Sequence, residues 1–167
     1  MHTVYAWFAE KAWDPSWRYR RWFVHVNAFR RLLRRCNAVV SGSFALQFFD
    51  RKRYIGSDMD IFLRCAGADE FCAWLKKEGY RLADGGTTYI RTSFPQDTLR
   101  AVAPRELRRG PLLGVHTFQR MVATSDGYVE VMRVQIIVVD TDPVEHILYE
   151  FHSSTSVCLD NTSYQCN

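Results

Sequence analysis

Two aspartates near the middle of the chain, Asp58 and Asp60, are the residues whose type and spacing most directly suggest chemistry. They lead into the apolar run Ile61-Phe62-Leu63, which is typical of a buried strand. Because side chains alternate along a strand, both carboxylates would share one face while Met59 turns into the core. Two neighbouring carboxylates repel each other unless a cation lies between them, and hard oxygen ligands favour Mg²⁺.

A corner of small residues precedes the aspartates. Residues 38–40 are apolar and typical of a short strand, Ser41-Gly42-Ser43 predicts a tight turn, and residues 44–49 predict a helix. Glycine lets the backbone approach a ligand closely, and the N–H groups at the start of a helix suit phosphate. Ser43 could cap that helix or reach a phosphate oxygen. The basic residues that follow could neutralise a polyphosphate, namely Arg51, Lys52 and Arg53.

Gly42-Ser43 followed by Ser57-Asp58-Met59-Asp60 resembles the core of the DNA polymerase β-like nucleotidyltransferase superfamily. The resemblance implies an α/β domain that transfers a nucleoside monophosphate from a nucleoside triphosphate, ATP above all, to a hydroxyl acceptor. It implies that Asp58 and Asp60 bind Mg²⁺ or Mn²⁺. The nucleotide would be held by Gly42, Ser43, Ser57, Arg51, Lys52 and Arg53. The combination of residues 45–51, 57–60, 134–137 and 151–153 is also similar to small, uncharacterised nucleotidyltransferase-like proteins of mushroom-forming fungi.

The superfamily carries a third catalytic acid on a later strand, and two residues compete for that place. Val134-Gln135-Ile136 has the expected apolar flanks but offers Gln135, a neutral amide that cannot act as a base. Glu130 supplies a carboxylate but lies close to the preceding turn. We favour Gln135, so the site would keep two of the three acids. The sequence therefore leaves open either an active enzyme or a degenerate member that binds a nucleotide or a protein partner without catalysis.

A third hypothesis, an RNA-binding module, comes from residues 17–36. Apolar side chains recur there at three- and four-residue spacing, which predicts one amphipathic helix, and most arginines fall on its other side. Such an arginine-rich face, from Arg18 to Arg35, is either simply solvated or a surface for RNA. The sequence leaves the acceptor and the oligomeric state open.

Length and composition predict one domain. The chain has 167 residues, 47% of them hydrophobic, and a net charge of +4. This length supports one core, and we expect a single domain over residues 1–152 with an N-terminal helical extension and a loosely ordered tail over residues 153–167. The five cysteines lack a CxxC pair, so neither a zinc site nor a disulfide framework is expected. Because no long apolar run or leader pattern is present, we expect a cytoplasmic protein without a membrane partner.

The remaining pattern predicts an α/β fold with a mixed β-sheet of about five strands flanked by helices. A helix is expected over residues 68–78, ending at Gly79. Asp126-Gly127 predicts a hairpin turn between strands 115–124 and 129–139. Short strands are expected at residues 80–82 and 87–92, an irregular insertion at residues 93–114, and a final helix that starts around residues 141–143 and runs to about residue 151.

Overall fold

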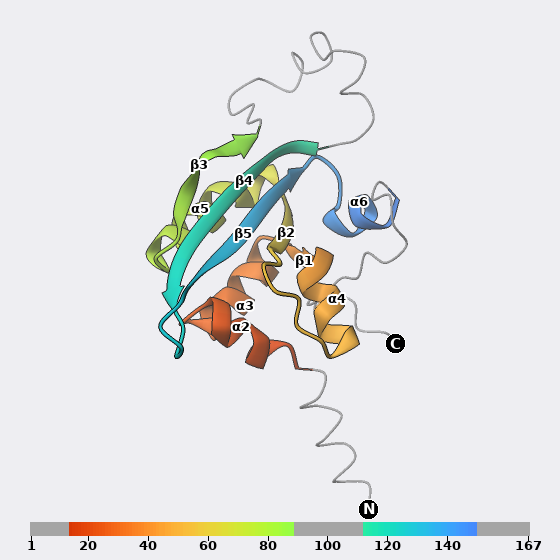
Figure 1. Ribbon diagram of the computed structural model, residues 1–167. Helices are drawn as coiled ribbons and strands as arrows, with labels where there is room; N and C mark the ends of the chain where they lie inside the picture. The colour runs from red at the N-terminus through yellow and green to blue at the C-terminus, as the bar shows by residue number, and fades with distance from the viewer. Residues whose placement is uncertain (1–13, 89–111, 150–167) are drawn as a thin grey trace, which may run out of the picture.

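A computed structural model describes residues 14–88 and 112–149 of the chain. These residues form one five-stranded sheet with helices packed around it, which confirms the predicted α/β fold (Figure 1). Three predicted parts lie outside the described residues: the N-terminal extension, residues 89–111 of the predicted strand and insertion, and the C-terminal tail. The elements are α2 (Ser16–Trp22), α3 (Val26–Arg35), β1 (Val39–Ser41), α4 (Gly42–Asp50), β2 (Met59–Arg64), α5 (Cys65–Lys77), β3 (Arg81–Thr88), β4 (Leu112–Ala123), β5 (Val129–Val139) and α6 (Pro143–Tyr149).

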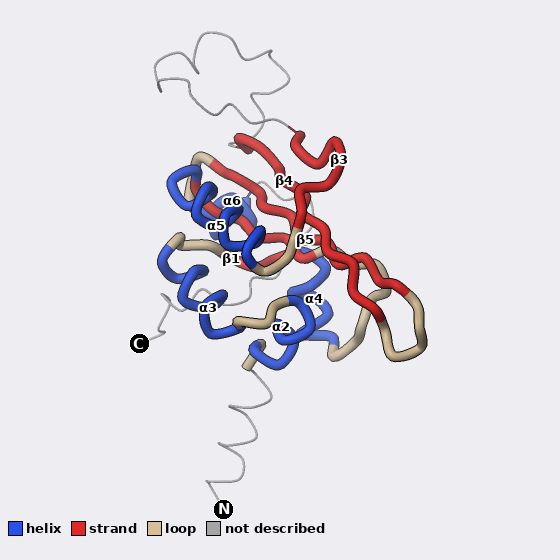
Figure 2. The backbone as a smooth tube through the Cα atoms, turned by 90° about the vertical axis from the view of Figure 1, so that its left-hand side faces the viewer, coloured by secondary structure: helices blue, strands red, loops and turns tan. Residues whose placement is uncertain are grey.

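The sheet is mixed, with strand order β1-β2-β5-β4-β3. Strands β2 and β5 run parallel, whereas β1 pairs with β2, and β4 with both β5 and β3, in antiparallel fashion. This register places Asp60 between Ser41 on β1 and Gln135 on β5. The predicted β4–β5 hairpin is confirmed, and its turn end extends beyond β2, whose pairing with β5 begins only at Val134 (Figure 2).

Helices cover the two faces of the sheet unequally. The main core joins the inner sides of α2, α3, α4 and α5 to one sheet face, which includes Met59, Ile61, Val134 and Ile136. A smaller cluster on the opposite face packs under Ile147 of α6. The other buried residues of this cluster are Val39, Phe62, Ile137 and Val139. Because residues alternate along β2, Asp60 shares this second face with Phe62. No helix in the described ranges is long and apolar enough to cross a membrane.

The prediction of one helix over residues 17–36 is wrong, because the chain breaks between Trp22 and Val26 into α2 and α3. Phe23 is extended and buried, so the backbone groups around it need other partners. Tyr80 and Arg120 donate hydrogen bonds to the Trp22 carbonyl at 2.9 and 2.8 Å, and the Val24 amide donates to Glu78 at 2.9 Å. The predicted apolar residues nevertheless join the core: Tyr19, Trp22, Phe23, Phe29 and Leu33 are buried, and Val26 is partly buried against them.

Several predicted element ends move by a few residues. The helix after the corner begins at Gly42 rather than residue 44, and the next helix begins at Cys65 rather than residue 68. The two short strands predicted on either side of Gly85 form one strand, β3, with an irregularity in its register. β4 begins at Leu112, so the last residues of the predicted insertion belong to the sheet.

Candidate functional site

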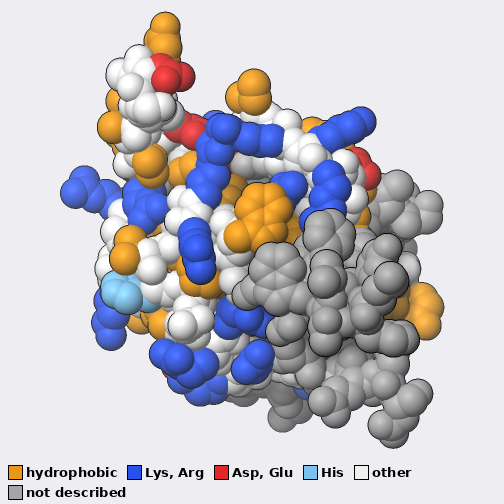
Figure 3. All heavy atoms as spheres, turned by 90° about the horizontal axis from the view of Figure 1, so that it is seen from below, with side chains coloured by type: hydrophobic (Ala, Val, Ile, Leu, Met, Phe, Trp, Pro, Cys, Tyr) orange, Lys and Arg blue, Asp and Glu red, His pale blue; other side chains and the backbone are white. Residues whose placement is uncertain are grey.

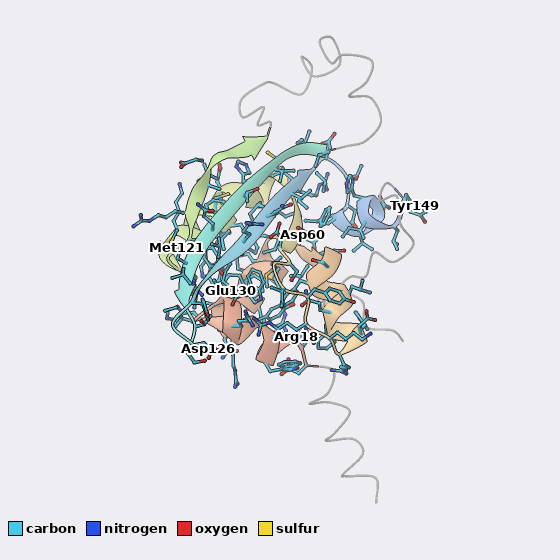
Figure 4. All side chains as sticks on the ribbon, viewed as in Figure 1. Arg18, Asp60, Met121, Asp126, Glu130 and Tyr149 are labelled. Atoms are coloured by element: carbon cyan, nitrogen blue, oxygen red, sulfur yellow. The ribbon has the colours of Figure 1, made fainter. Side chains whose placement is uncertain are left out.

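The corner between β1 and α4 brings Gly42 against Asp60. Gly42 has φ of +69°, a conformation that favours glycine, and it opens the nine-residue helix α4. A Cβ atom added to Gly42 would overlap Oδ2 of Asp60 and lie 3.0 Å from its Cγ. The carboxylate therefore occupies the space that any other residue at position 42 would fill. In Figure 4, Asp60 lies at the beginning of β2, beside the start of α4.

Burial makes the Asp60 carboxylate costly to ionise. Its pKa rises to about 6, mainly because burial removes it from water and secondarily because the Asp58 carboxylate repels its charge. The repulsion agrees with the expectation that both acids point to one side of the strand. Met59 between them is fully buried on the opposite face, as predicted.

Asp58 lies just before β2 and is held by two side chains of β5. Gln135 donates a hydrogen bond from Nε2 to Oδ2 of Asp58 at 3.1 Å, and Arg133 Nη1 lies 3.5 Å from Oδ1. Gln135 is thus the β5 residue beside the acid pair, opposite Asp60 in the register. Within the described ranges, no group of three or more His, Cys, Asp or Glu side chains is arranged to hold a metal.

Ser43 and Ser57 fix the loop that leads to Asp58. The Ser43 hydroxyl donates to the Asp58 carbonyl at 3.4 Å and does not cap α4, whose N-cap residue is Ser41. Buried Gln47 donates from Nε2 to the Ser57 hydroxyl at 2.7 Å and to the Ser43 carbonyl at 3.1 Å. It also accepts a hydrogen bond from the Tyr54 amide at 2.8 Å. Gln47 therefore ties α4 to the loop between α4 and β2.

The basic loop and Glu130 lie elsewhere. Glu130 binds the guanidinium groups of Arg21 and Arg53, the latter at 3.4 Å, and the Arg51 guanidinium lies 5.1 Å from the centre of the Phe48 ring. A cavity of about 320 Å³ is lined by Glu130 and by the cations Arg21, Arg51, Lys52 and Arg53, but not by Asp58 or Asp60. On β5, Glu130 alternates with Arg133 and Gln135, so it points to the other face of the sheet. Figure 4 shows Glu130 near the turn end of the β4–β5 hairpin, closer to Arg18 than Asp60 is.

The arginines of the predicted RNA-binding face take several partners within the fold. Arg18 donates to the Lys52 carbonyl at 3.2 Å, Arg30 to the Ser16 hydroxyl at 3.0 Å, and Arg35 to Glu70. They also belong to two helices rather than one. RNA binding by this face stays a prediction, and the internal contacts leave fewer of its charges available than the sequence suggests.

The donor set at the corner fits one divalent cation. After burial, repulsion from the Asp58 carboxylate is the second cause that raises the pKa of Asp60, and a bound cation would remove that repulsion. Asp58 is 26% exposed, so its oxygens remain accessible from one side. The side chain beside it, Gln135, adds an amide and no charge. The residues present therefore suit a single Mg²⁺ ion better than a pair of ions.

The structure divides the residues expected to form the site into two groups. It brings together Gly42, Ser43, Asp58, Asp60 and Gln135, and it places Arg51, Lys52, Arg53, Ser57 and Glu130 around the cavity. Sequence reasoning missed Arg133 and Gln47. Arg133 could have been predicted, because it lies two residues before Gln135 and so shares its face of the strand. Nothing in the sequence distinguishes Gln47.

In comparisons with known proteins, no protein-family model, no curated protein and no solved structure matches this chain. The residues and their geometry are therefore what a functional hypothesis must rest on.

Proposed function

We propose that the protein is a Mg²⁺-dependent nucleotidyltransferase that moves a nucleoside monophosphate from a nucleoside triphosphate, ATP foremost, to a hydroxyl acceptor. The observation that supports this proposal is the contact between the Asp60 carboxylate and Gly42 at the start of α4. It joins carboxylates that can hold a metal to a helix N-terminus that can hold phosphate, two groups that a metal–triphosphate complex needs side by side.

In the reaction, the acceptor oxygen would form a bond to the α-phosphorus and pyrophosphate would leave. Mg²⁺ held by Asp58 and Asp60 would neutralise charge on the phosphate oxygens and favour loss of the acceptor proton. The N–H groups at the start of α4 and the Ser43 hydroxyl would orient the triphosphate. Arg133, beside Asp58, supplies a fixed positive charge near the place where a third acid would bind a second ion.

A second function, nucleotide binding without turnover, is favoured by the hydrogen bond from Gln135 to Asp58. The amide occupies one Asp58 oxygen and adds no charge for a second metal. Loss of one electrostatic partner in such a site slows a reaction by about 10²- to 10⁴-fold. The same corner would then bind a metal–nucleotide complex and transfer slowly or not at all.

Labelled triphosphates incubated with candidate hydroxyl acceptors test the proposal. The wild type should transfer label only when Mg²⁺ is present, and Asp58→Ala/Asp60→Ala should lower the rate at least about 10³-fold, because both metal ligands are lost. Equal labelling by the two proteins would refute the proposal. Calorimetric titration with ATP and Mg²⁺ separates the two functions: binding without transfer supports the second, and absence of binding excludes both.

A change of Gln135 to glutamate is expected to strengthen metal binding at the corner. It places a third carboxylate beside Asp58, where the amide now donates a hydrogen bond. The Mg²⁺ affinity should rise about tenfold, and the fold without metal should lose about 1 kcal/mol through added repulsion. Thermal denaturation across a Mg²⁺ series measures both effects, with Asn27→Asp, at an exposed position of α3, as the control for one added charge. An unchanged Mg²⁺ midpoint in Gln135→Glu would show that the ion does not bind here.

A further inference from the structure

A cavity of about 320 Å³ opens beside the basic loop; its lining reaches Ser57, the residue before Asp58, but includes neither Asp58 nor Asp60. Its walls come from α2, the inner side of α4, the loop of residues 51–57 and the first residues of β5, close to the hairpin turn. The view from below shows lysine and arginine side chains gathered around hydrophobic ones on this side of the molecule (Figure 3). None of the groups proposed to bind metal takes part in its lining.

The cavity does not include the residues that contact the acid pair. On β5, Glu130, Val131 and Met132 line the cavity, and Met132 also belongs to the main core under the helices. Arg133 and Gln135, which contact Asp58, lie farther along the strand, outside the lining, and alternate with Glu130 and Met132. A ligand in the cavity would therefore be separate from one bound at Asp58 and Asp60.

The cavity walls carry a strong excess of positive charge. Five cationic side chains line it against a single acid, Glu130, which is already bound by Arg21 and Arg53. Burial, followed by repulsion from Arg51, lowers the pKa of Arg18, so positive charges are crowded there. An anion in the cavity would relieve this crowding. The other lining cations are Arg51 and Lys52.

Four aromatic side chains also line the cavity. Trp17 is 51% exposed and Tyr54 is 36% exposed, while Trp22 and Phe44 are buried. The guanidinium of Arg18 lies 4.8 Å from the centre of the Trp17 ring, so a cation and an aromatic face stand next to each other. Partly exposed rings beside arginines suit a planar, negatively charged ligand, because the ring stacks and the cation pairs with the charge.

We infer that this cavity binds a mononucleotide, with the base against the aromatic wall and the phosphate at the Arg18 and Lys52 side chains. The volume matches pockets for single small molecules and is too small for several stacked bases of a strand. Binding needs no divalent cation, because the positive charge comes from the protein itself. This site is independent of the proposed transferase activity and would exist even if the Gly42 corner had no ligand.

The test titrates AMP, with EDTA present, into the full-length Asp58→Asn/Asp60→Asn protein, in which the corner cannot hold metal. We expect a dissociation constant on the order of 10–100 µM that weakens as salt is added. Trp17→Ala should weaken binding about tenfold through lost stacking, and Lys52→Ala about threefold to tenfold through lost charge. Both side chains are largely exposed, so the fold should tolerate these changes. Arg20→Ala removes an exposed arginine of the same helix outside the cavity and should leave AMP binding unchanged.

Three results would overturn the inference. Inorganic phosphate that binds as tightly as AMP would show that the aromatic wall contributes nothing. Binding of a single-stranded RNA oligonucleotide without binding of AMP would show that the surface accepts a strand rather than a mononucleotide. AMP affinity that falls equally in Arg20→Ala and Lys52→Ala would show attraction by overall charge and no defined site.

Discussion

Gly42→Ala is expected to lower the free energy of unfolding by about 2–4 kcal/mol and to abolish binding of metal and nucleotide at the corner. Two effects combine. The residue at position 42 has φ of +69°, which is strained for alanine, and the new methyl group would overlap Oδ2 of Asp60. The Asp60 carboxylate would have to rotate away from the start of α4, so the metal ligand and the phosphate-binding backbone would separate.

Gly56→Ala is the matched control for the backbone effect. Gly56 has φ of +74°, and a Cβ atom there meets nothing within 4 Å. Gly56→Ala should therefore lower the free energy of unfolding only by the strain of the backbone conformation, about 1–2 kcal/mol. The difference between the two variants, measured by chemical denaturation, isolates the contact with Asp60.

A second change should rescue the first. Asp60→Ala removes Oδ2 and Cγ, the two atoms closest to the added methyl group. In the Gly42→Ala background it should restore more than about 1 kcal/mol of stability, a coupling typical of residues in direct contact. If Gly42→Ala costs no more than Gly56→Ala and Asp60→Ala restores nothing, the corner does not hold the carboxylate as described.

Asp60→Asn is expected to stabilise the fold by about 2–3 kcal/mol at pH 7 to 8 while removing the stabilisation that Mg²⁺ provides. The pKa of Asp60 rises from an ordinary 3.8 to about 6, so keeping this carboxylate charged at neutral pH lowers the free energy of unfolding. Asparagine has the same shape and no charge. A gain in stability combined with a loss of ligand binding is the pattern expected where function retains a destabilising group.

The pH dependence of this gain has a definite sign. Below pH 3.8 Asp60 is protonated in both folded and unfolded chains, so the charge costs nothing. Between 3.8 and about 6 the unfolded chain loses its proton first, so the wild type loses stability as pH rises. Above about pH 6 the cost is complete and constant. The stability difference between variant and wild type should therefore grow from pH 4.5 to about 6.5 and then level off.

Urea denaturation of both proteins from pH 4.5 to 8 measures this difference. Asp84→Asn, which changes an exposed acid of β3 at the opposite edge of the sheet, serves as a control for the loss of one negative charge. In a separate series at pH 7.5, about 10 mM Mg²⁺ should stabilise the wild type by about 1 kcal/mol and leave Asp60→Asn unchanged. A stability difference that is independent of pH would contradict the burial of the Asp60 charge.

Local pattern was sufficient for much of the scaffold around the corner. Asp126-Gly127 between two β-branched runs predicted the β4–β5 hairpin, and the structure confirms it. Alternation predicted that Met59 faces the core, which it does at full burial. The apolar flanks of Gln135 favoured it over Glu130 as the neighbour of the acids, and the parallel register of β2 and β5 places it there. These features depend on short-range periodicity, which a sequence displays directly.

Other features could not be predicted because their causes lie far away in the chain. The break after Trp22 exists because Tyr80, Arg120 and Glu78 satisfy backbone groups that a continuous helix would have paired internally. Periodicity within residues 17–36 contains no trace of those partners. The basic loop was expected to help bind the triphosphate, yet its arginine at position 53 pairs with Glu130 on the opposite face of the sheet.

By itself, the sequence determined the two alternating faces of each strand, the glycine at the corner and the pairing of Asp58 with Asp60. Only the tertiary structure decided that the carboxylate of Asp60 lies against Gly42, that Arg133 and Gln135 flank Asp58, and that the cationic loop lines a different cavity. The physical reason is that chain-local preferences set which way a side chain points relative to its own strand or helix. Which distant side chain it meets depends on the strand register and on how the helices pack, and these arise from the fold as a whole.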